Sequence, residues 1–306
     1  MLARSIIVRF LRSMAAIFIV ITLVFFVVRV TGDPVRSLVP ENAPQATVDH
    51  YREVFGLNAP LWEQYIYYLR GILHGDFGAS YFDADGALNI VMQRIPATLQ
   101  IALPAFFLST VLGLSSGILA AAHSGDRVGR IISSTAIGFA ALPNFVVGIV
   151  LILVLGVQLH WFPAAGNTSA NSMVMPVLTM ALPPAAILAR VTQTSMAEAL
   201  ALPCVAHAHA IHVNRWRRIL AHALPNASRS IITIVGFDLA YLVAGSAVVE
   251  VLFGWPGVGS LFVHASEQND YAVVQCIVVV VTISVVIVHA LTDVAYRLVD
   301  PRLRSM

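Results

Sequence analysis

The stretch from Leu200 to Pro225 reads LALPCVAHAHAIHVNRWRRILAHALP and is the longest polar interruption in the second half of a very apolar sequence. It carries Arg215, Arg217 and Arg218 together with four histidines. Long apolar runs lie on both sides of it. We therefore predict that it is a cytoplasmic loop between two segments that cross a membrane, and that a partner protein binds it.

The composition also indicates a membrane protein. Of the 306 residues, 58% are hydrophobic and 11% are charged, whereas soluble domains average about 25% charged residues. The sequence contains Arg but no Lys. A phosphate-binding P-loop needs a Lys, so this chain is not expected to be a standard P-loop ATPase. If ATP drives its work, another subunit hydrolyses it.

Six apolar runs predict an all-α polytopic membrane protein with six transmembrane helices. Each run supplies the about 20 residues that a spanning helix needs. The first is too long for the core of a signal peptide, so we expect it to be retained. Pro183 and Pro184 predict a kink in the fourth. The runs lie at residues 10–30, 97–122, 131–157, 173–196, 231–253 and 272–298.

The placement of Arg predicts the orientation, because cytoplasmic loops are enriched in basic residues. The two short loops at 158–172 and 254–271 contain no Arg, which assigns them to the outside. Both termini are then cytoplasmic. The predicted organisation comprises a cytoplasmic N-terminus with the first transmembrane helix, an extracytoplasmic segment, and a five-helix core with a cytoplasmic loop at about 200–229; these parts span residues 1–31, 32–95 and 96–306.

No residue pattern indicates catalysis, a metal site or a cofactor. The sequence lacks HExxH, CxxC and GxSxG motifs. His207 and His209 fall on nearly opposite faces of a helix at 100° per residue, so a regular helix would not hold one ion between them. Gly113 and Gly117 form a GxxxG pair in the second run, which fits a close helix crossing or a chance spacing in a glycine-containing apolar helix.

At the end of the polar stretch, the chain resembles the transmembrane permease subunits of binding-protein-dependent ABC importers. Their signature is EAA, three residues, Gly, nine residues, then I-x-L-P. Aligning on Leu224 and Pro225 places the glycine position at His212 and the EAA positions at Ala206–Ala208. The Leu-Pro pair and one Ala agree with the signature, whereas the Glu and Gly do not.

The resemblance extends over nearly the whole chain and favours the dipeptide/oligopeptide/nickel branch, in the first permease position. The matching motifs occur in order and at the right spacing. They are Thr31–Pro34, Gln64-Tyr65, Gly75–Gly78, Ser80-Tyr81, Pro96–Leu99, Ala181–Pro183, Glu250–Phe253, Pro256–Gly259, Asp270-Tyr271 and Asp300–Arg304.

The resemblance implies a type I ABC importer permease fold in the plasma (inner) membrane. It also implies a second permease subunit as heterodimer partner, two ATP-binding subunits and an extracytoplasmic substrate-binding protein; lipid is the other contact, and no nucleic acid is expected. The polar loop would form a coupling helix in a groove of the ATPase, with Val205 and Ala208 contributing to its apolar face. The implied coupling residues are Ala206, His207, Ala208, His212, Arg215, Leu224 and Pro225.

The cargo implied by the resemblance is a di- or oligopeptide or a related small solute, and nickel or another metal chelate stays open. Ionisable residues within apolar runs are the default candidates for a translocation path. They are Arg190, Asp238, Glu250 and Asp293. Glu250 fits a cap for the following turn equally well, and Asp238 fits a structural hydrogen bond.

Two other classes remain as rivals. A stand-alone secondary transporter would need coupling-ion sites and often shows inverted repeats, and neither is visible here. An intramembrane enzyme would need a nucleophile with a base, and no such pair is recognisable.

Overall fold

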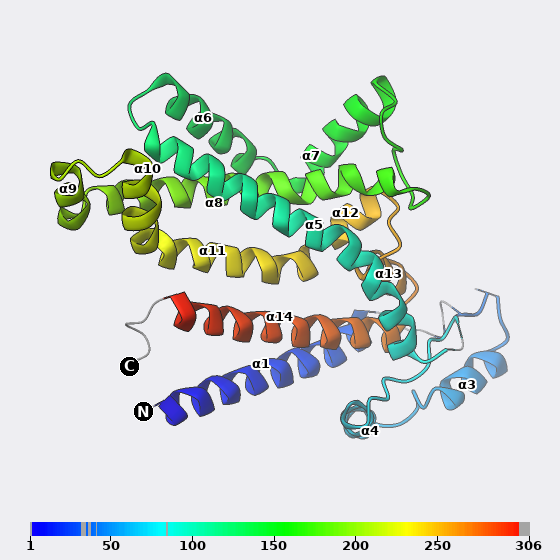
Figure 1. Ribbon diagram of the computed structural model, residues 1–306. Coiled ribbons are helices and arrows are strands. Elements are labelled where there is room, and N and C mark those ends of the chain that lie inside the picture. Colours follow the sequence, from blue (N-terminus) through cyan, green and yellow to red (C-terminus); the bar gives the residue numbers. More distant parts are fainter. Residues whose placement is uncertain (1, 32–34, 36–37, 41, 84, 300–306) are drawn as a thin grey trace. The chain divides into compact units, whose positions relative to one another are not determined.

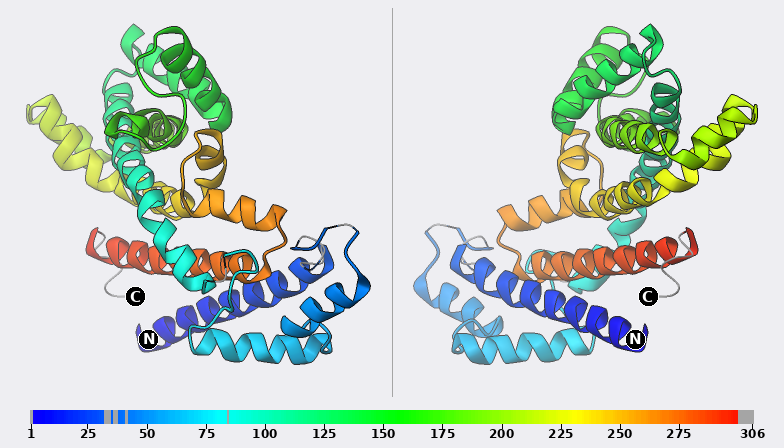
Figure 2. Two further views of the ribbon diagram at one scale, coloured as in Figure 1. Left: turned by 90° about the vertical axis from the view of Figure 1, so that its right-hand side faces the viewer. Right: turned by 90° about the vertical axis from the view of Figure 1, so that its left-hand side faces the viewer.

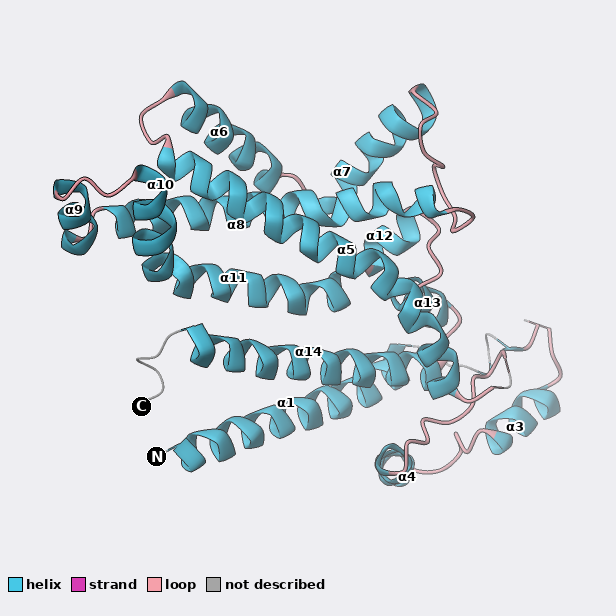
Figure 3. Cartoon of the chain, in the orientation of Figure 1, coloured by secondary structure: helices cyan, strands magenta, loops and turns pink. Residues whose placement is uncertain are grey.

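The computed structural model describes residues 2–31, 35, 38–40, 42–83 and 85–299. The sequence motifs at Gly32–Pro34 and Asp300–Arg304 lie outside the described residues. Figure 3 shows helices joined by loops, and within the described ranges the one pairing of extended backbone is an isolated bridge between Ala79 and Gly86. The all-helical class predicted from the sequence is therefore confirmed.

The chain divides into two compact units. One comprises Met1–Thr98 and Pro256–Ser284, and the other comprises Leu99–Trp255 and Val285–Met306. Two long helices, α5 (Ala87–Ala122) and α14 (Tyr271–Val299), contribute to both units.

Four helical segments are long and apolar enough to cross a membrane. They correspond to the predicted first, second, fourth and sixth spans, and a bent pair of helices raises the number to as many as five. Pro183 and Pro184 lie inside α8 (Val174–Leu200), and the kink predicted there stays a prediction. The four segments are Leu11–Val30 in α1 (Leu2–Thr31), Ala87–Ala122 in α5, Ala170–Leu200, which includes α8, and Tyr271–Thr292 in α14.

The predicted third span is not one straight helix. It is divided into α6 (Arg127–Ala141) and α7 (Asn144–Leu151), and α7 continues as a π-helix over Ile152–Gln158. The two arms are bent by 102° at the break. Leu142 is extended, with ψ 130°, because the ring of Pro143 disfavours helical backbone in the residue before it. The apolar run predicted the length correctly but not the bend.

The predicted fifth span, residues 231–253, also differs. The helix α11 (Leu224–Gly245) ends before Ser246, and a short helix α12 (Ala247–Leu252) follows. Gly245 disfavours helix propagation, and the ring of Tyr241 occupies the place that a Cβ of Gly245 would need. The single uninterrupted span expected here is therefore wrong.

The helix of the second span begins at Ala87, well before the predicted boundary at 95/96. Pro96 favoured a start there, since proline suits the first turn of a helix. The added turns are held by burial, because Ala87, Ile90 and Val91 join a core cluster that includes Ile277. Tertiary packing thus outweighs the cost of a proline inside the helix.

Among the described residues after α1 the chain forms α3 (Gln45–Val54) and α4 (Leu61–Leu73), and then a turn that returns to α14. In this turn Ser80 Oγ donates to Asp270 Oδ2 at 2.5 Å, and both residues are buried. Asp270 also caps α14, because its Oδ1 accepts from Val273 N at 3.3 Å. Burial raises the pKa of Asp270, and the hydrogen bond from Ser80 opposes that shift.

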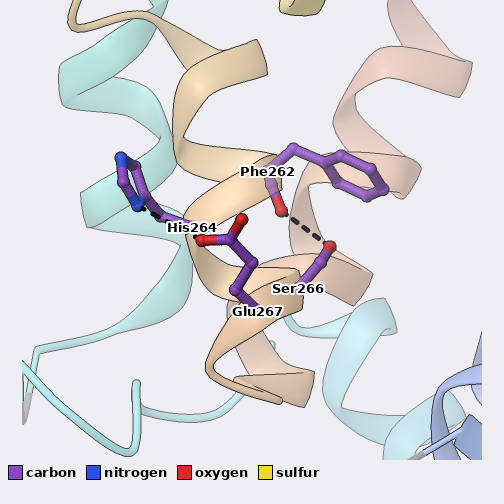
Figure 4. Close-up of polar contacts among 4 residues, drawn as sticks. All are labelled: Phe262, His264, Ser266 and Glu267. Carbon is purple, nitrogen blue, oxygen red and sulfur yellow. Dashed lines mark hydrogen bonds and ion pairs between the residues drawn. The ribbon is translucent and has the colours of Figure 1, made fainter. Parts of the chain in front are cut away.

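The helix α13 (Val258–Glu267) is held by its buried face, which includes Val258 and Ala265. Its polar face carries an exposed pair, His264 Nδ1 and Glu267 Oε2, 3.9 Å apart (Figure 4). An exposed pair of this kind contributes little to stability.

The buried Ser80–Asp270 contact should be coupled energetically. A double-mutant cycle with Ser80→Ala and Asp270→Asn is expected to give a coupling of about 1–3 kcal/mol, because Ser80→Ala leaves the buried carboxylate without its donor and Asp270→Asn removes the charge that strengthens the bond. Denaturant unfolding of the detergent-purified chain measures it. Glu267→Gln in the exposed pair is the control and should change stability by less than about 0.5 kcal/mol. Equal effects of Asp270→Asn and Glu267→Gln would refute the role of the buried contact.

Candidate functional site

The predicted loop connects α8 to α11 through short helices. The chain leaves α8 at Leu200 and forms α9 (Pro203–Ala210), the single turn α10 (Arg215–Arg217) and a π-helix at Arg218–Ala223. The label α9 marks the tip of this connection in Figure 1. Leu224 and Pro225 open α11, where a proline is tolerated because the first N–H groups of a helix have no intrahelical acceptor. The Leu-Pro pair of the signature is therefore a helix start.

The end of α9 explains why the signature has a glycine at the position of His212. Val213 N donates to Ala208 O at 3.0 Å, and His212 N donates to His209 O at 3.0 Å. These two bonds form a Schellman motif, whose left-handed residue is usually Gly. His212 occupies that position with φ 61°. The departure from the signature thus keeps the backbone geometry and adds left-handed strain.

The inner face of the connection packs within its own unit. Val205 and Ala208 are buried, which differs from the expectation that they face a partner. Further along, Ile219 and Ala223 join a core cluster with Met196 of α8. The periodicity of α9 predicted one apolar face correctly, but the chain itself covers that face.

The outward face of α9 is formed by small and polar residues instead. Ala206, His207, His209 and Ala210 are exposed there, and Ile211 follows them with 62% of its surface exposed. A partner that binds the connection would meet this face.

Arg215 ties the connection to a third helix. Its guanidinium donates to the carbonyl oxygen of Ala122, the last residue of α5. Carbonyls at a helix C-terminus lack intrahelical donors, and a cation there also interacts favourably with the helix dipole. The resemblance implied a coupling role for Arg215 toward a partner, and this structure gives its guanidinium an acceptor within the chain.

The GxxxG pair in α5 is a close helix crossing, which decides between the two readings left open by the sequence. A Cβ on Gly113 would lie 2.8 Å from the Cβ of Leu188, and one on Gly117 would lie 2.6 Å from the carbonyl oxygen of Ala189. Any larger residue would push α5 away from α8. The crossing is visible in Figure 1. It therefore sets the spacing of the two helices whose ends hold the connection.

The four candidates for a translocation path lie on four helices. Arg190 is exposed on α8, and Glu250 on α12 is completely buried. The backbone carbonyl of Glu250 accepts from Trp255 N at 2.8 Å, which closes the following turn. Asp238 on α11 is half-buried, and its Oδ2 has no hydrogen-bond partner among the described residues. Asp293 lies in α14, and its side chain is outside the described part of the chain.

Several motifs that the sequence presented separately bind one another in the first unit. Gln64 accepts from Arg29 Nε at 3.0 Å, Ser80 binds Asp270, and the ring of Tyr81 lies 6.2 Å from that of Tyr271. Sequence reasoning missed Arg29 altogether. Its signal was the cation in the last turn of α1, at the end of a long apolar run.

Family models match both parts of the chain. The family described as "Binding-protein-dependent transport system inner membrane component" matches residues 113–305. The one described as "Binding-prot-dependent transport system membrane comp, N-term" matches residues 1–102.

Curated relatives match along almost their whole length. The chain is 34% identical over 306 residues to "Probable peptide ABC transporter permease protein y4tP" of Sinorhizobium fredii (strain NBRC 101917 / NGR234), with 97% of each chain covered. It is 31% identical over 297 residues to "Glutathione transport system permease protein GsiC" of Escherichia coli (strain K12), again with 97% of each covered.

Among solved structures, the chain is similar to inward-facing forms of the MetNI methionine ABC transporter. One match has a TM-score of 0.58 and 18% identity, and covers 69% of this chain and 96% of that one. A second crystal form gives a TM-score of 0.56 and 17% identity with the same coverage. At these identities the likeness shows the fold alone.

The chain belongs to the family of binding-protein-dependent transport system inner membrane components. It is a multi-pass permease subunit of the inner membrane, and its nearly full-length similarity to the two curated relatives places it in the branch indicated by its motifs.

Replacing His212 should reveal the strain at the end of α9. We expect His212→Gly to stabilise the chain by about 0.5–1 kcal/mol, since relief of left-handed strain exceeds the extra entropy that Gly loses on folding. Denaturant unfolding in detergent measures the change. Ala206→Gly is the control and should destabilise by about 1 kcal/mol, because it lies inside α9. A destabilising His212→Gly would show that the side chain of His212, and not its backbone, matters.

The close crossing makes a second prediction. Gly117→Ala should destabilise the chain by about 1–3 kcal/mol, because the added methyl meets backbone of α8 that has little room to move. Gly138→Ala in α6 is the matched control: no atom lies within 4 Å of its Cβ position, and a better helix former there should stabilise by up to about 1 kcal/mol. The unfolding midpoints of the two variants should move in opposite directions. Identical behaviour would contradict the crossing.

Proposed function

We propose that this permease subunit forms half of an ATP-driven path for peptides. Two observations on relatives support the cargo: one is named as a probable peptide permease and the other as a glutathione permease. Glutathione is itself a tripeptide, so a peptide-like solute accounts for both names. Nothing comparable supports nickel, and membership of a binding-protein-dependent family leaves little support for a stand-alone secondary transporter or an intramembrane enzyme.

The partners follow from the family. The proposed assembly contains a second permease subunit, two ATP-binding subunits and an extracytoplasmic substrate-binding protein. This chain contributes no catalytic residue, and the ATP-binding subunits hydrolyse ATP. Both termini are cytoplasmic in this proposal, and residues 32–95 belong to the extracytoplasmic side. The bent pair of α6 and α7 then counts as one crossing, and α11 with α12 supplies another, which restores six.

The observation that carries the mechanism is the construction of the connection between α8 and α11. Its inner face is buried with α8, its exit turn is fixed by the Schellman bonds, and Arg215 holds it to the end of α5. A push on the outward face of α9 would therefore move three helices together. We assign the ATPase contact to that face, at Ala206, His207 and Ala210. His212 shapes the exit, while Leu224 and Pro225 start the helix that carries the motion onward.

The path residues keep distinct roles in this proposal. Asp238 is the strongest candidate to meet a cargo with an amine group, because one of its carboxylate oxygens is buried and finds no hydrogen-bond partner in the part of the chain that the structure describes. Glu250 fits the structural role better, since it is fully buried beside the turn that its backbone closes. Arg190 is exposed within the described part of its unit and is available to line a path with a partner subunit. Asp293 is retained as a candidate on its position alone.

A single reconstitution tests cargo and coupling. The complete importer in proteoliposomes should accumulate a radiolabelled dipeptide in the presence of ATP, and should not accumulate a nickel–histidine chelate. Ala206→Arg should abolish uptake and prevent the ATP-binding subunit from co-purifying with the tagged permease, because a long cation then stands on the docking face.

The matched control is Ala46→Arg, an equally exposed alanine on α3. It should leave co-purification unchanged, since α3 lies in the segment assigned to the other side of the membrane. Normal co-purification of Ala206→Arg would remove the ATPase contact from α9. Uptake of the nickel chelate without peptide uptake would overturn the cargo.

A further inference from the structure

The helix α4 is fastened to the apolar part of α1. Tyr65 Oη and Thr22 Oγ1 share a hydrogen bond of 2.7 Å, and the ring of Phe25 stacks on that of Tyr68 at 5.4 Å between centroids. At one end of this contact Arg29 Nε donates to Gln64 Oε1 at 3.0 Å. Figure 2 shows α4 in light blue beside α1 in dark blue. The contact is specific, because it combines buried rings with two polar bonds.

The position of this contact along α1 sets the depth of α4. The segment Leu11–Val30 is long and apolar enough to cross a membrane. At 1.5 Å per residue, Thr22 lies about 12 Å inside the end of that segment at Val30. A helix that reaches Thr22 with a side chain is therefore held at the level of the lipid, and not above it in bulk water.

Away from α1, α4 leaves large apolar residues and the charged Glu63 uncovered within the described part of its unit. It presents Leu61, Trp62, Ile66, Tyr67 and Leu73, with 66% of Trp62 and 83% of Leu73 exposed. A cation, Arg70, stands exposed on the same helix. Large exposed apolar patches mark a surface that something else covers.

Lipid is the occupant that these features fit. Trp and Tyr gather at the boundary between acyl chains and headgroups, and Arg binds lipid phosphates. The neighbouring helix α3 differs: Asp49, His50 and Glu53 are all exposed on it, as expected of a helix in water. The exposed large apolar residues of α3 are Tyr51 and Val54, so the larger apolar surface lies on the helix that α1 holds at membrane depth.

We propose that α4 is an interfacial helix that lies in the outer leaflet, with Trp62, Ile66 and Leu73 toward the acyl chains and Arg70 toward the phosphates. The segment 32–95 then divides into a lipid-bound helix and a water-exposed remainder. This assignment rests on α1 crossing the membrane and on the proposed orientation that puts residues 32–95 outside, and it is independent of the cargo and of the ATPase contact.

Spin labels test the depth directly. Cys204→Ser and Cys276→Ala provide a background without cysteines, and single cysteines then replace Trp62, Leu73 or, as the control, Asp49. The labelled importer is placed in nanodiscs of phosphatidylethanolamine and phosphatidylglycerol. The labels at 62 and 73 should be relaxed more by oxygen than by a water-soluble nickel chelate, and the label at 49 should show the reverse. If the nickel chelate relaxes the labels at 62 and 73 as strongly as the label at 49, the proposal is wrong.

Two further measurements separate the remaining possibilities. Phospholipids brominated on the acyl chain should quench the fluorescence of the cysteine-containing importer, and Trp62→Phe should remove part of that quenching. Equal quenching of the unsubstituted importer and of Trp62→Phe would contradict the proposal. This measurement needs no spin label, so it remains valid if a labelled variant fails to assemble. The labels at 62 and 73 could instead be protected from the nickel chelate only after the substrate-binding protein is added. That result would assign the surface to the binding protein and not to lipid.

Discussion

The close approach of α5 and α8 is the constraint on which the second unit depends. Gly113 and Gly117 let the backbone of α5 lie against Leu188, Ala189 and their neighbours, where no side chain would fit. Helix association in a membrane gains little from the hydrophobic effect, since lipid is as apolar as the helices, and close packing of small residues takes its place. This contact fixes two helix ends at once: Ala122 at the end of α5 and Leu200 at the end of α8.

The connection between α8 and α11 is built on those two ends. Arg215 donates to the terminal carbonyl of α5, and Ile219 and Ala223 pack with Met196 of α8. The polar stretch is therefore held in place by contacts with the long helices. The single turn α10 is fixed to α5 and the π-helix is fixed to α8, which is what the segment needs if force applied to α9 is to reach the path. The strain at His212 leaves this geometry intact, because the Schellman bonds hold the residue in place.

The first unit is organised by polar contacts between segments that are distant in sequence. The bond between Ser80 and Asp270 closes the turn after α4 onto the start of α14, and Arg29 joins α1 to α4 through Gln64. Buried polar groups are costly unless they are paired, so such pairs select one arrangement of the segments over others. The lipid-facing surface proposed for α4 follows from the same arrangement, since the face turned toward α1 leaves Trp62 and Leu73 outside.

The sequence by itself determined the helical class, four of the spans, the family and the GxxxG pair as a possible crossing. These follow from local composition, spacing and motif order, which are properties of the sequence alone. Pro143 also indicated a break, because the residue before a proline avoids helical backbone. The continuous apolar run nevertheless led to the prediction of a single span. Only the tertiary structure decided that Val205 and Ala208 turn inward, that Arg215 caps α5 and that α4 packs against α1. Each of those choices depends on residues outside the segment concerned, 93 positions away in the case of Arg215 and Ala122. Periodicity shows that a face is apolar without showing what covers it.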